Sequence, residues 1–228
     1  MLYVALGDSV TYGYSATNNR RSYVQRIARS LSKQERVNVY LHAKPGWTSA
    51  RLLKSVKSVQ PSIFDEAKLT TLMVGGNDLL RSSPFLLNGN HSHLMKVADR
   101  YYQNLTNIVE LAYRPGTRFI IATLYNPFPN SVLAEEYTGL VNDCVRRVAR
   151  RYNLLLADIA ARFDGKEFRF VEGYKRGSIR DFRIRGNPIH PNDAGHGAIA
   201  QGFLAMYRRA GVKDIAKGGK LKRTQKSP

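Results

Sequence analysis

The stretch Met1–Gly13, MLYVALGDSVTYG, decides the fold of this chain. An apolar run from Leu2 to Leu6 stops at Gly7-Asp8-Ser9. A short, continuous apolar run that ends at a glycine is typical of a strand buried in a parallel sheet. Ligands of open α/β sheets bind beyond the carboxyl ends of the strands, so Ser9 stands where a side chain can act on a bound molecule. A plain polar turn is the alternative interpretation.

The rest of the chain alternates between strand and helix patterns. Further apolar runs predict strands over residues 37–41, 69–74, 118–124 and 154–157. Apolar residues at helical spacing predict helices over residues 22–31, 50–56, 63–67, 94–113, 131–152 and 193–210. Candidate N-caps are Ser22, Thr48 or Ser49, and Asp193. The alternation predicts a three-layer α/β/α sandwich with a five-stranded parallel sheet, and residues 163–188 are expected to form a long loop.

Length and composition favour one folded domain. The chain has 228 residues, of which 43% are hydrophobic, and we assign residues 1–212 to the domain and 213–228 to a basic, flexible tail. No run of 18 apolar residues predicts a membrane span, and the start of the chain lacks the pattern of a secretory signal. Cys144 is the only cysteine, so no intrachain disulfide is expected, and we interpret it as a buried thiol.

The charge balance is strongly basic. Lys and Arg number 36 against 17 acidic residues, a formal net charge of +19. Such a surface attracts anionic membranes or acidic polymers. Basic and aromatic residues do not interleave regularly and no nucleic-acid motif is present, so specific nucleic-acid binding is not predicted. The pattern fits a cytoplasmic protein or one associated with a cell or spore surface, and leaves the oligomeric state open.

Three of the predicted strands end in polar turns that contain glycine: Gly7-Asp8-Ser9, Pro45-Gly46-Trp47 and Gly75-Gly76-Asn77-Asp78. A parallel sheet brings these ends to one edge. Acyl transfer requires a nucleophile, a base, and donors aimed at the developing oxyanion. Ser9 offers the hydroxyl, and the backbone N–H groups of Ser9 and Gly46 and the Asn77 amide are candidate donors.

The chain has five histidines that could serve as the general base of such a site. His190, in the loop before the last predicted helix and followed by a proline, is the best candidate, because a histidine held on a loop can reach a serine on another strand end. His42 ends a strand and is expected to be structural, and His196 lies inside the last helix pattern as a packed or surface residue. His91 and His93 give only weak evidence for a metal site, since no third ligand is near them in the sequence.

Four blocks of sequence, taken together, carry a family resemblance. Gly7-Asp8-Ser9, Gly46, Gly75-Gly76-Asn77-Asp78 and the run HPNDAGH at 190–196 resemble the blocks of the SGNH (GDSL-type) hydrolase superfamily, in order and spacing, as in bacterial esterases and lipases. The resemblance implies a flavodoxin-like sandwich that hydrolyses esters, including lipids, acylated sugars and thioesters. It implies Ser9 as nucleophile, Ser9, Gly46 and Asn77 as oxyanion donors, and His190 as general base, with no metal or organic cofactor.

The chain departs from the family pattern at residue 187. The family usually has aspartate three residues before the histidine, where this chain has Asn187. A carboxylate orients the histidine and stabilises its cation, whereas an amide oxygen accepts the same hydrogen bond without the charge. Three interpretations stay open: the Asn187 side chain orients His190, a main-chain carbonyl near 187 does so, or a carboxylate such as Asp181 folds in. We therefore expect a Ser–His dyad with a weak third member.

Other interpretations concern the carboxylates and the loops. Asp8 and Asp78 resemble a carboxylate pair for glycoside chemistry, but are expected to cap or pin their turns, and Asp158 is expected to be structural. The apolar stretches 81–92, expected as a loop, and 125–129 are candidate walls of an acyl pocket, or ordinary loop packing. The rival to an esterase is a degenerate hydrolase that binds polyanions through its basic surface.

Overall fold

The computed structural model describes residues 1–86, 91–181 and 188–221; the side chains of residues 83–86, 91, 93 and 211–221 lie outside this description. Five parallel strands form one sheet in the order β2-β1-β3-β4-β5. They are β1 (Leu2–Gly7), β2 (Asn38–Ala43), β3 (Ala67–Met73), β4 (Arg118–Ala122) and β5 (Leu155–Ala157). This is the flavodoxin-like order, in which the strand sequence reverses beside β1.

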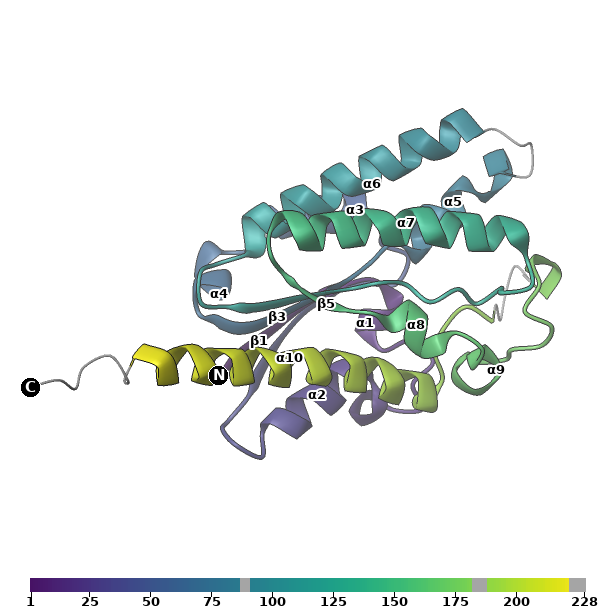
Figure 1. Ribbon diagram of the computed structural model, residues 1–228. Coiled ribbons are helices and arrows are strands. Elements are labelled where there is room, and N and C mark those ends of the chain that lie inside the picture. Colours follow the sequence, from purple (N-terminus) through teal and green to yellow (C-terminus); the bar gives the residue numbers. More distant parts are fainter. Residues whose placement is uncertain (87–90, 182–187, 222–228) are drawn as a thin grey trace, which may run out of the picture.

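Helices cover both faces of the sheet (Figure 1). Helices α3, α6 and α7 lie on one side, and α2 and α10 on the other. The predicted three-layer α/β/α sandwich is therefore confirmed. The α-helices are α1 (Ser9–Tyr12), α2 (Tyr23–Leu31), α3 (Ser49–Val56), α4 (Pro61–Asp65), α5 (Gly76–Leu86), α6 (His91–Ala112), α7 (Val132–Arg151), α8 (Ile159–Phe163), α9 (Glu167–Phe170) and α10 (Asp193–Leu221), and the 3₁₀ turns are η1 (Asn19–Arg21) and η2 (Ile179–Asp181).

Strand β1 is the centre of the core. Residues Tyr3 to Leu6 are 0% exposed, because helices cover both faces of the strand and a neighbouring strand lies on each side. The buried Tyr3 hydroxyl shares a hydrogen bond of 3.0 Å with the Thr71 hydroxyl of β3. A polar group at this depth requires such a partner. The continuous apolar run at the start of the sequence thus forms the buried strand that its pattern predicted.

Two of the predicted helix caps are confirmed and one is wrong. The Ser22 hydroxyl accepts from the N–H of residue 25, and Thr48, rather than Ser49, caps α3 by accepting from the N–H of residue 51. Asp193 does not cap α10. The side chain of Asn192 accepts from the N–H groups of residues 194 and 195 at 3.0 Å each, and Asp193 is instead bound to Thr17.

Several segments contain more helix than the sequence indicated. Asn77 and Asp78, expected in a turn, lie in the first turn of α5, and the expected loop 81–92 is helical over 81–86 and from 91 on. The expected loop 163–188 contains α9 and η2. The backbone of α10 continues past residue 210 to Leu221, and so includes part of segment 213–228. The flexibility of that segment stays a prediction.

Within the described part of the chain, no helix combines the length and the apolar character needed to cross a membrane. Cys144, on α7, is 4% exposed, and its thiol contacts the Ala98 carbonyl oxygen at 3.5 Å. Burial raises the pKa of this thiol. The structure agrees with a buried, unreactive cysteine.

Candidate active site

Ser9 is presented by the sharp turn between β1 and α1. Gly7 ends the strand, and a Cβ at this position would overlap the Thr11 side chain and the Met73 carbonyl oxygen. The Asp8 carboxylate accepts from the N–H of Val10 at 3.0 Å and so caps α1. Ser9 is the first residue of that helix and is 8% exposed. Its hydroxyl therefore stands at the carboxyl edge of the sheet, as the sequence predicted.

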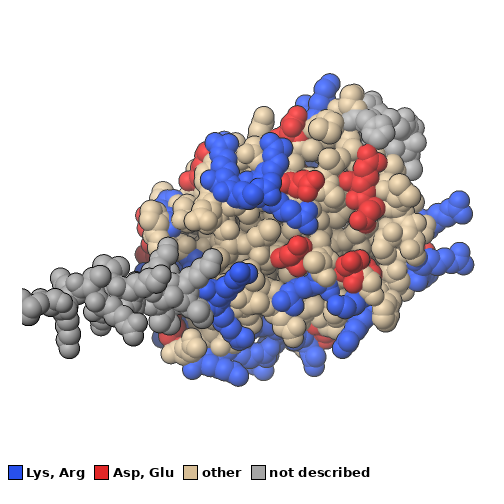
Figure 2. Space-filling view, in the orientation of Figure 1, with Lys and Arg blue, Asp and Glu red and all other residues tan. Residues whose placement is uncertain are grey.

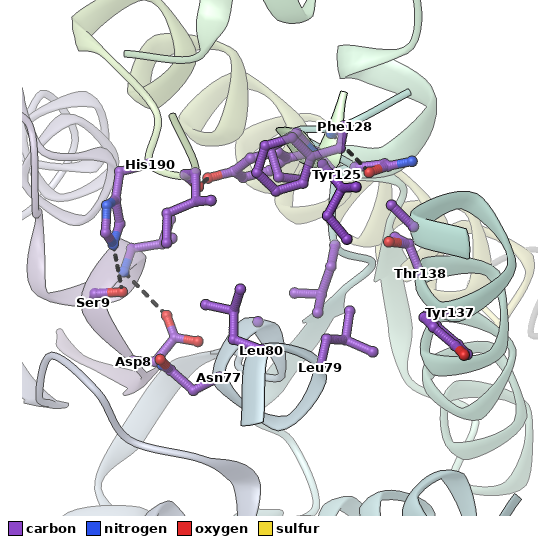
Figure 3. A pocket seen from close by; sticks show the side chains of 18 of the residues that line it. Asp8, Ser9, Asn77, Leu79, Leu80, Tyr125, Phe128, Tyr137, Thr138 and His190 are labelled. Carbon is purple, nitrogen blue, oxygen red and sulfur yellow. Dashed lines mark hydrogen bonds between the residues drawn. The ribbon is translucent and has the colours of Figure 1, made fainter. Parts of the chain in front are cut away.

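His190 reaches Ser9 from the loop before α10. Its Nε2 atom lies 3.0 Å from Ser9 Oγ, although the two residues are 181 positions apart in the chain (Figure 3). Two bonds hold the loop: Tyr125 donates its hydroxyl proton to the Ile189 carbonyl at 2.7 Å, and the N–H of Glu172 donates to the His190 carbonyl at 2.8 Å. The sequence singled out this pair, and the fold brings the two side chains into hydrogen-bond contact.

The surroundings of His190 favour the neutral imidazole. Burial, and secondarily the charge of His196, lower the pKa of His190 to about 4. At neutral pH the ring is thus uncharged and able to accept a proton. The Tyr14 ring lies against it, with 4.4 Å between ring centroids.

A buried histidine that the sequence left open fixes Tyr14. His196 is 0% exposed; its Nδ1 accepts from the N–H of Tyr23 at 3.3 Å, and its Nε2 lies 3.0 Å from the Tyr14 carbonyl oxygen. Because Nδ1 accepts a hydrogen bond, the ring proton is on Nε2, which donates a hydrogen bond to the Tyr14 carbonyl. The helical pattern predicted that His196 was packed or exposed, but no signal in the sequence linked it to Tyr14.

The candidate oxyanion donors come from two further strand ends. Gly46 has φ +79° in the turn after β2, a conformation that favours glycine. The Asn77 side-chain amide donates to the Trp47 carbonyl at 2.9 Å, so α5 is tied to this turn, and within the described residues its second amide N–H makes no further hydrogen bond. Asn77 and Ser9 both line the cavity described below, whereas Gly46 does not contribute to its wall.

Asp78 braces the same turn. Its carboxylate accepts from the Ser49 N–H at 2.8 Å and the Ser49 hydroxyl at 2.6 Å, at the start of α3. Asp8 caps α1, and burial raises the pKa of its carboxyl to about 7. Asp158 caps α8 by accepting from the N–H of residue 161. All three therefore have structural partners, and the arrangement gives no support to glycoside chemistry by a pair of carboxylates.

Asn187 lies in the segment 182–187, which is outside the described residues, whereas the main chain of residues 188–221 is described. The role of Asn187 as third member of the site therefore stays a prediction. Asp181 is engaged in its own loop, where its Oδ2 accepts from the N–H groups of Arg176 and Ser178 at 2.8 and 3.3 Å. The alternative in which Asp181 orients His190 is therefore not supported. The side chains of His91 and His93 also lie outside the described part, so their metal interpretation stays untested.

A cavity of about 410 Å³ opens beside Ser9. The predicted wall 125–129 is confirmed for residues 125–128. The other predicted wall is the stretch 81–92, but the side chains of residues 83–91 lie outside the described part of the structure. Leu79 and Leu80 of α5, which directly precede this stretch, do line the cavity. The sequence did not indicate the wall formed by α7, because the spacing of Leu133 and Tyr137 fits a core helix equally well.

The fold is a flavodoxin-like α/β/α sandwich that brings Ser9, Asn77 and His190 together at the carboxyl edge of its sheet. A model of the GDSL-like lipase/acylhydrolase family matches residues 5–198, which is most of the chain, and the chain belongs to this family. It is 27% identical over 215 residues to the spore germination lipase LipC of Bacillus licheniformis, and the match covers 89% of this chain and 94% of that protein.

Solved structures share the architecture. The lipase Lip_vut3 from a goat rumen metagenome has a TM-score of 0.76 at 24% identity, covering 90% of this chain and 97% of that one. The acetylxylan esterase Axe2 of Geobacillus stearothermophilus has a TM-score of 0.66 at 18% identity, covering 90% and 93%. These likenesses show the fold. With the family membership, they make this protein an ester hydrolase of the GDSL, or SGNH, type.

Proposed function

We propose that the protein hydrolyses carboxylic esters through an acyl-Ser9 intermediate, with His190 as general base. The observation that carries the proposal is the 3.0 Å contact between Ser9 Oγ and His190 Nε2 at the mouth of an apolar cavity. A nucleophile in hydrogen-bond contact with a neutral base is the arrangement that acyl transfer requires.

The reaction follows in two half-steps. Ser9 Oγ attacks the ester carbonyl carbon while its proton passes to His190 Nε2, and the N–H groups of Ser9, Gly46 and Asn77 stabilise the oxyanion. The tetrahedral intermediate collapses, the ester C–O bond breaks, and His190 gives its proton to the departing alcohol. Water then attacks the acyl group by the same route, and releases the acid and free Ser9.

The rival function, a degenerate hydrolase that only binds polyanions, is not favoured. Family membership supports an ester hydrolase, and Ser9, Asn77 and His190 are grouped at one cavity. Ester and lipid substrates fit the family, and LipC is called a lipase. Binding of the basic surface to anionic membranes or acidic polymers belongs to our proposal as an additional interaction, which is tested separately below.

The decisive experiment compares two serine variants. Ser9→Ala is expected to lower kcat/KM on a soluble p-nitrophenyl ester by at least about 10³-fold, because it removes the nucleophile. Ser58→Ala, at an exposed serine whose hydroxyl donates to the nearby Ser55 carbonyl, is the matched control and should keep full activity. A fluorophosphonate probe should label the wild type at Ser9, as read by peptide mass spectrometry. Full activity in Ser9→Ala would reject the mechanism.

The role of residue 187 needs its own variant. If the missing carboxylate limits the enzyme, Asn187→Asp should raise kcat and shift the acid limb of the pH profile, because a carboxylate stabilises the imidazolium that forms in the transition state. An unchanged rate and profile would show that charge at this position is not limiting. The measurement is kcat on a short-chain ester between pH 4 and 9.

A further inference from the structure

Polar side chains lie at two opposite sides of the cavity beside Ser9. Ser9 and His190 lie at one side of the opening, and Tyr137 and Thr138 of α7 lie across from them (Figure 3). Leu79 and Leu80 of α5 form part of the wall between the two ends. The cavity therefore begins at the proposed nucleophile and leads away from it, between α5 and α7.

Most of the cavity lining is hydrocarbon. Leu79, Leu80, Leu124, Phe128 and Leu133 line it, and none of these side chains can donate or accept a hydrogen bond, although Asn126 and Arg180 also lie in the wall. A sugar or peptide placed there would lose its hydrogen bonds to water without replacement, at a cost of kilocalories for each polar group. An alkyl chain would gain from leaving water. The lining thus selects a hydrocarbon chain.

The size of the cavity limits the length of that chain. A dry cavity of roughly 150 Å³ holds one benzene ring, so a volume of 410 Å³ corresponds to on the order of sixteen carbon-sized atoms. The ester group and the first atoms of the alcohol occupy part of this space. A chain of about six to ten carbons fills the remainder, whereas an acetyl group leaves most of it empty.

The order of the chemical steps decides which half of the ester occupies the cavity. The alcohol leaves after the first half-reaction, whereas the acyl group stays bonded to Ser9 until water attacks. Tyr14, whose ring packs against His190, is 50% exposed to solvent, so this side of the site is open to water. The acyl group, which stays attached to Ser9 for longer than the alcohol, is therefore the part of the ester that we assign to the apolar cavity.

We infer that the enzyme is selective for esters of medium-chain fatty acids, of about six to ten carbons, and that the cavity between α5 and α7 is its acyl-binding site. This inference rests on the proposed Ser9 mechanism and specifies its substrate. It separates this chain from an esterase that is specific for acetyl groups.

Two series of substrates test the inference. In the first, p-nitrophenyl esters carry acyl chains of 2 to 16 carbons, and kcat/KM should rise about two- to fourfold per methylene up to about C8, then level off or fall beyond C10. In the second, acetates carry alcohols of the same lengths, and kcat/KM should change little. All substrates are used below their aggregation concentrations, so that an interface does not contribute.

Variants at Leu133 place the effect in the cavity. Leu133→Trp fills it and should move the optimum to shorter chains, with at least a tenfold fall in the ratio of C8 to C2 rates. Leu133→Ala enlarges it and should move the optimum to longer chains. Val132→Trp is the matched control, because Val132 precedes Leu133 on α7 but is 87% exposed, and its ratio should equal that of the wild type. Because the C8 and C2 rates are measured on the same preparation, their ratio does not depend on the fraction of enzyme that is folded.

The outcomes separate the two proposals. Activity that depends on Ser9 but is highest on acetate, or flat with acyl length, overturns the acyl-chain inference and leaves the mechanism in place. Dependence on the alcohol chain instead of the acyl chain also overturns it. Activity that survives Ser9→Ala rejects the mechanism itself. Equal profiles for the wild type and both Leu133 variants would show that the cavity does not bind the chain.

Discussion

At the scale of single residues, the imidazole of His190 differs from a histidine side chain in water. Burial lowers its pKa to about 4, from an ordinary value near 6.5. A general base works only when neutral, so activity is retained above the folded-state pKa and lost as the pH falls through it. We expect kcat/KM on a soluble ester to fall to half near pH 4. A midpoint at 6.5 would contradict this environment.

Tyr14 offers a way to perturb that pKa. Its ring covers one side of the imidazole, so Tyr14→Ala should admit water, raise the pKa of His190 and move the acid limb of the profile to higher pH. Tyr14→Phe keeps the ring and should retain the wild-type profile. A purely structural role for Tyr14 would lower the amount of active enzyme without moving the midpoint.

Asp8 makes a second pH-dependent contribution, to stability. Burial raises the pKa of its carboxyl from 3.8 to about 7, so the folded state binds this proton more tightly than the unfolded state does. The stabilisation is complete below pH 3.8 and is lost as the pH rises through 7. Relative to Asp8→Asn, which keeps a side-chain oxygen to cap α1, the wild type should lose roughly 2 kcal/mol of unfolding free energy between pH 5 and 8.

Urea unfolding at both pH values measures this difference. The control is Asp158→Asn, the same change at the N-cap of α8, where the carboxylate is 44% exposed. It shows what the same exchange does at an N-cap whose side chain is not deeply buried. Parallel curves for the wild type and Asp8→Asn would show that Asp8 does not hold its proton in the folded protein.

At the scale of elements, the start of α10 holds the His190 loop against α9. A Cβ on Gly195 would overlap the Phe170 carbonyl oxygen, which accepts from the N–H of Asn192 at 2.9 Å. We expect Gly195→Ala to lower the unfolding free energy by about 1–3 kcal/mol and to reduce activity, because the loop must move to accept the methyl group.

Gly197→Ala is the matched control on the same helix. The nearest atom to its Cβ is in the Arg26 guanidinium, at 3.5 Å, which is ordinary contact. Alanine suits a helix interior better than glycine, so this variant should gain about 0.5–1 kcal/mol and remain active. Thermal and urea unfolding of both variants provide the comparison. Equal stability of the two would contradict the close packing at Gly195.

The sequence predicted the elements whose signals are local. The apolar run of β1, the polar strand ends and the histidine before α10 each appear within a few residues, and parallel topology then places Ser9 near His190. The cap of α10 was assigned to the wrong neighbour, because Asn192 and Asp193 are both good caps and only the tertiary bond of Asp193 to Thr17 decides between them. The α7 wall and the Tyr14–His196 contact depend on packing between distant segments, which periodicity does not encode.

At the scale of the whole molecule, the chain carries a formal net charge of +19. Figure 2 shows Lys and Arg side chains over much of one face, with fewer Asp and Glu side chains among them. A positive surface concentrates the protein at anionic membranes, and salt screens that attraction over a Debye length of about 10 Å at 0.1 M and about 3 Å at 1 M.

We therefore expect salt to affect two substrates differently. Hydrolysis of a short-chain ester embedded in anionic vesicles should fall several-fold between about 0.05 and 0.5 M NaCl, because binding to the vesicle weakens. Hydrolysis of the same ester in neutral solution, without vesicles, should stay within about twofold. The same salt dependence in both assays would show that the basic surface does not bring the enzyme to its substrate.

The separation of Ser9 and His190 by 181 residues has a consequence for biosynthesis. At about 5–20 residues per second, the histidine is translated roughly 10–40 s after the serine. Until then the nascent polypeptide carries the proposed nucleophile without its proposed base. We therefore expect a chain that ends before His190 to lack esterase activity, so that the enzyme becomes active only when the segment around His190 has been made and has folded.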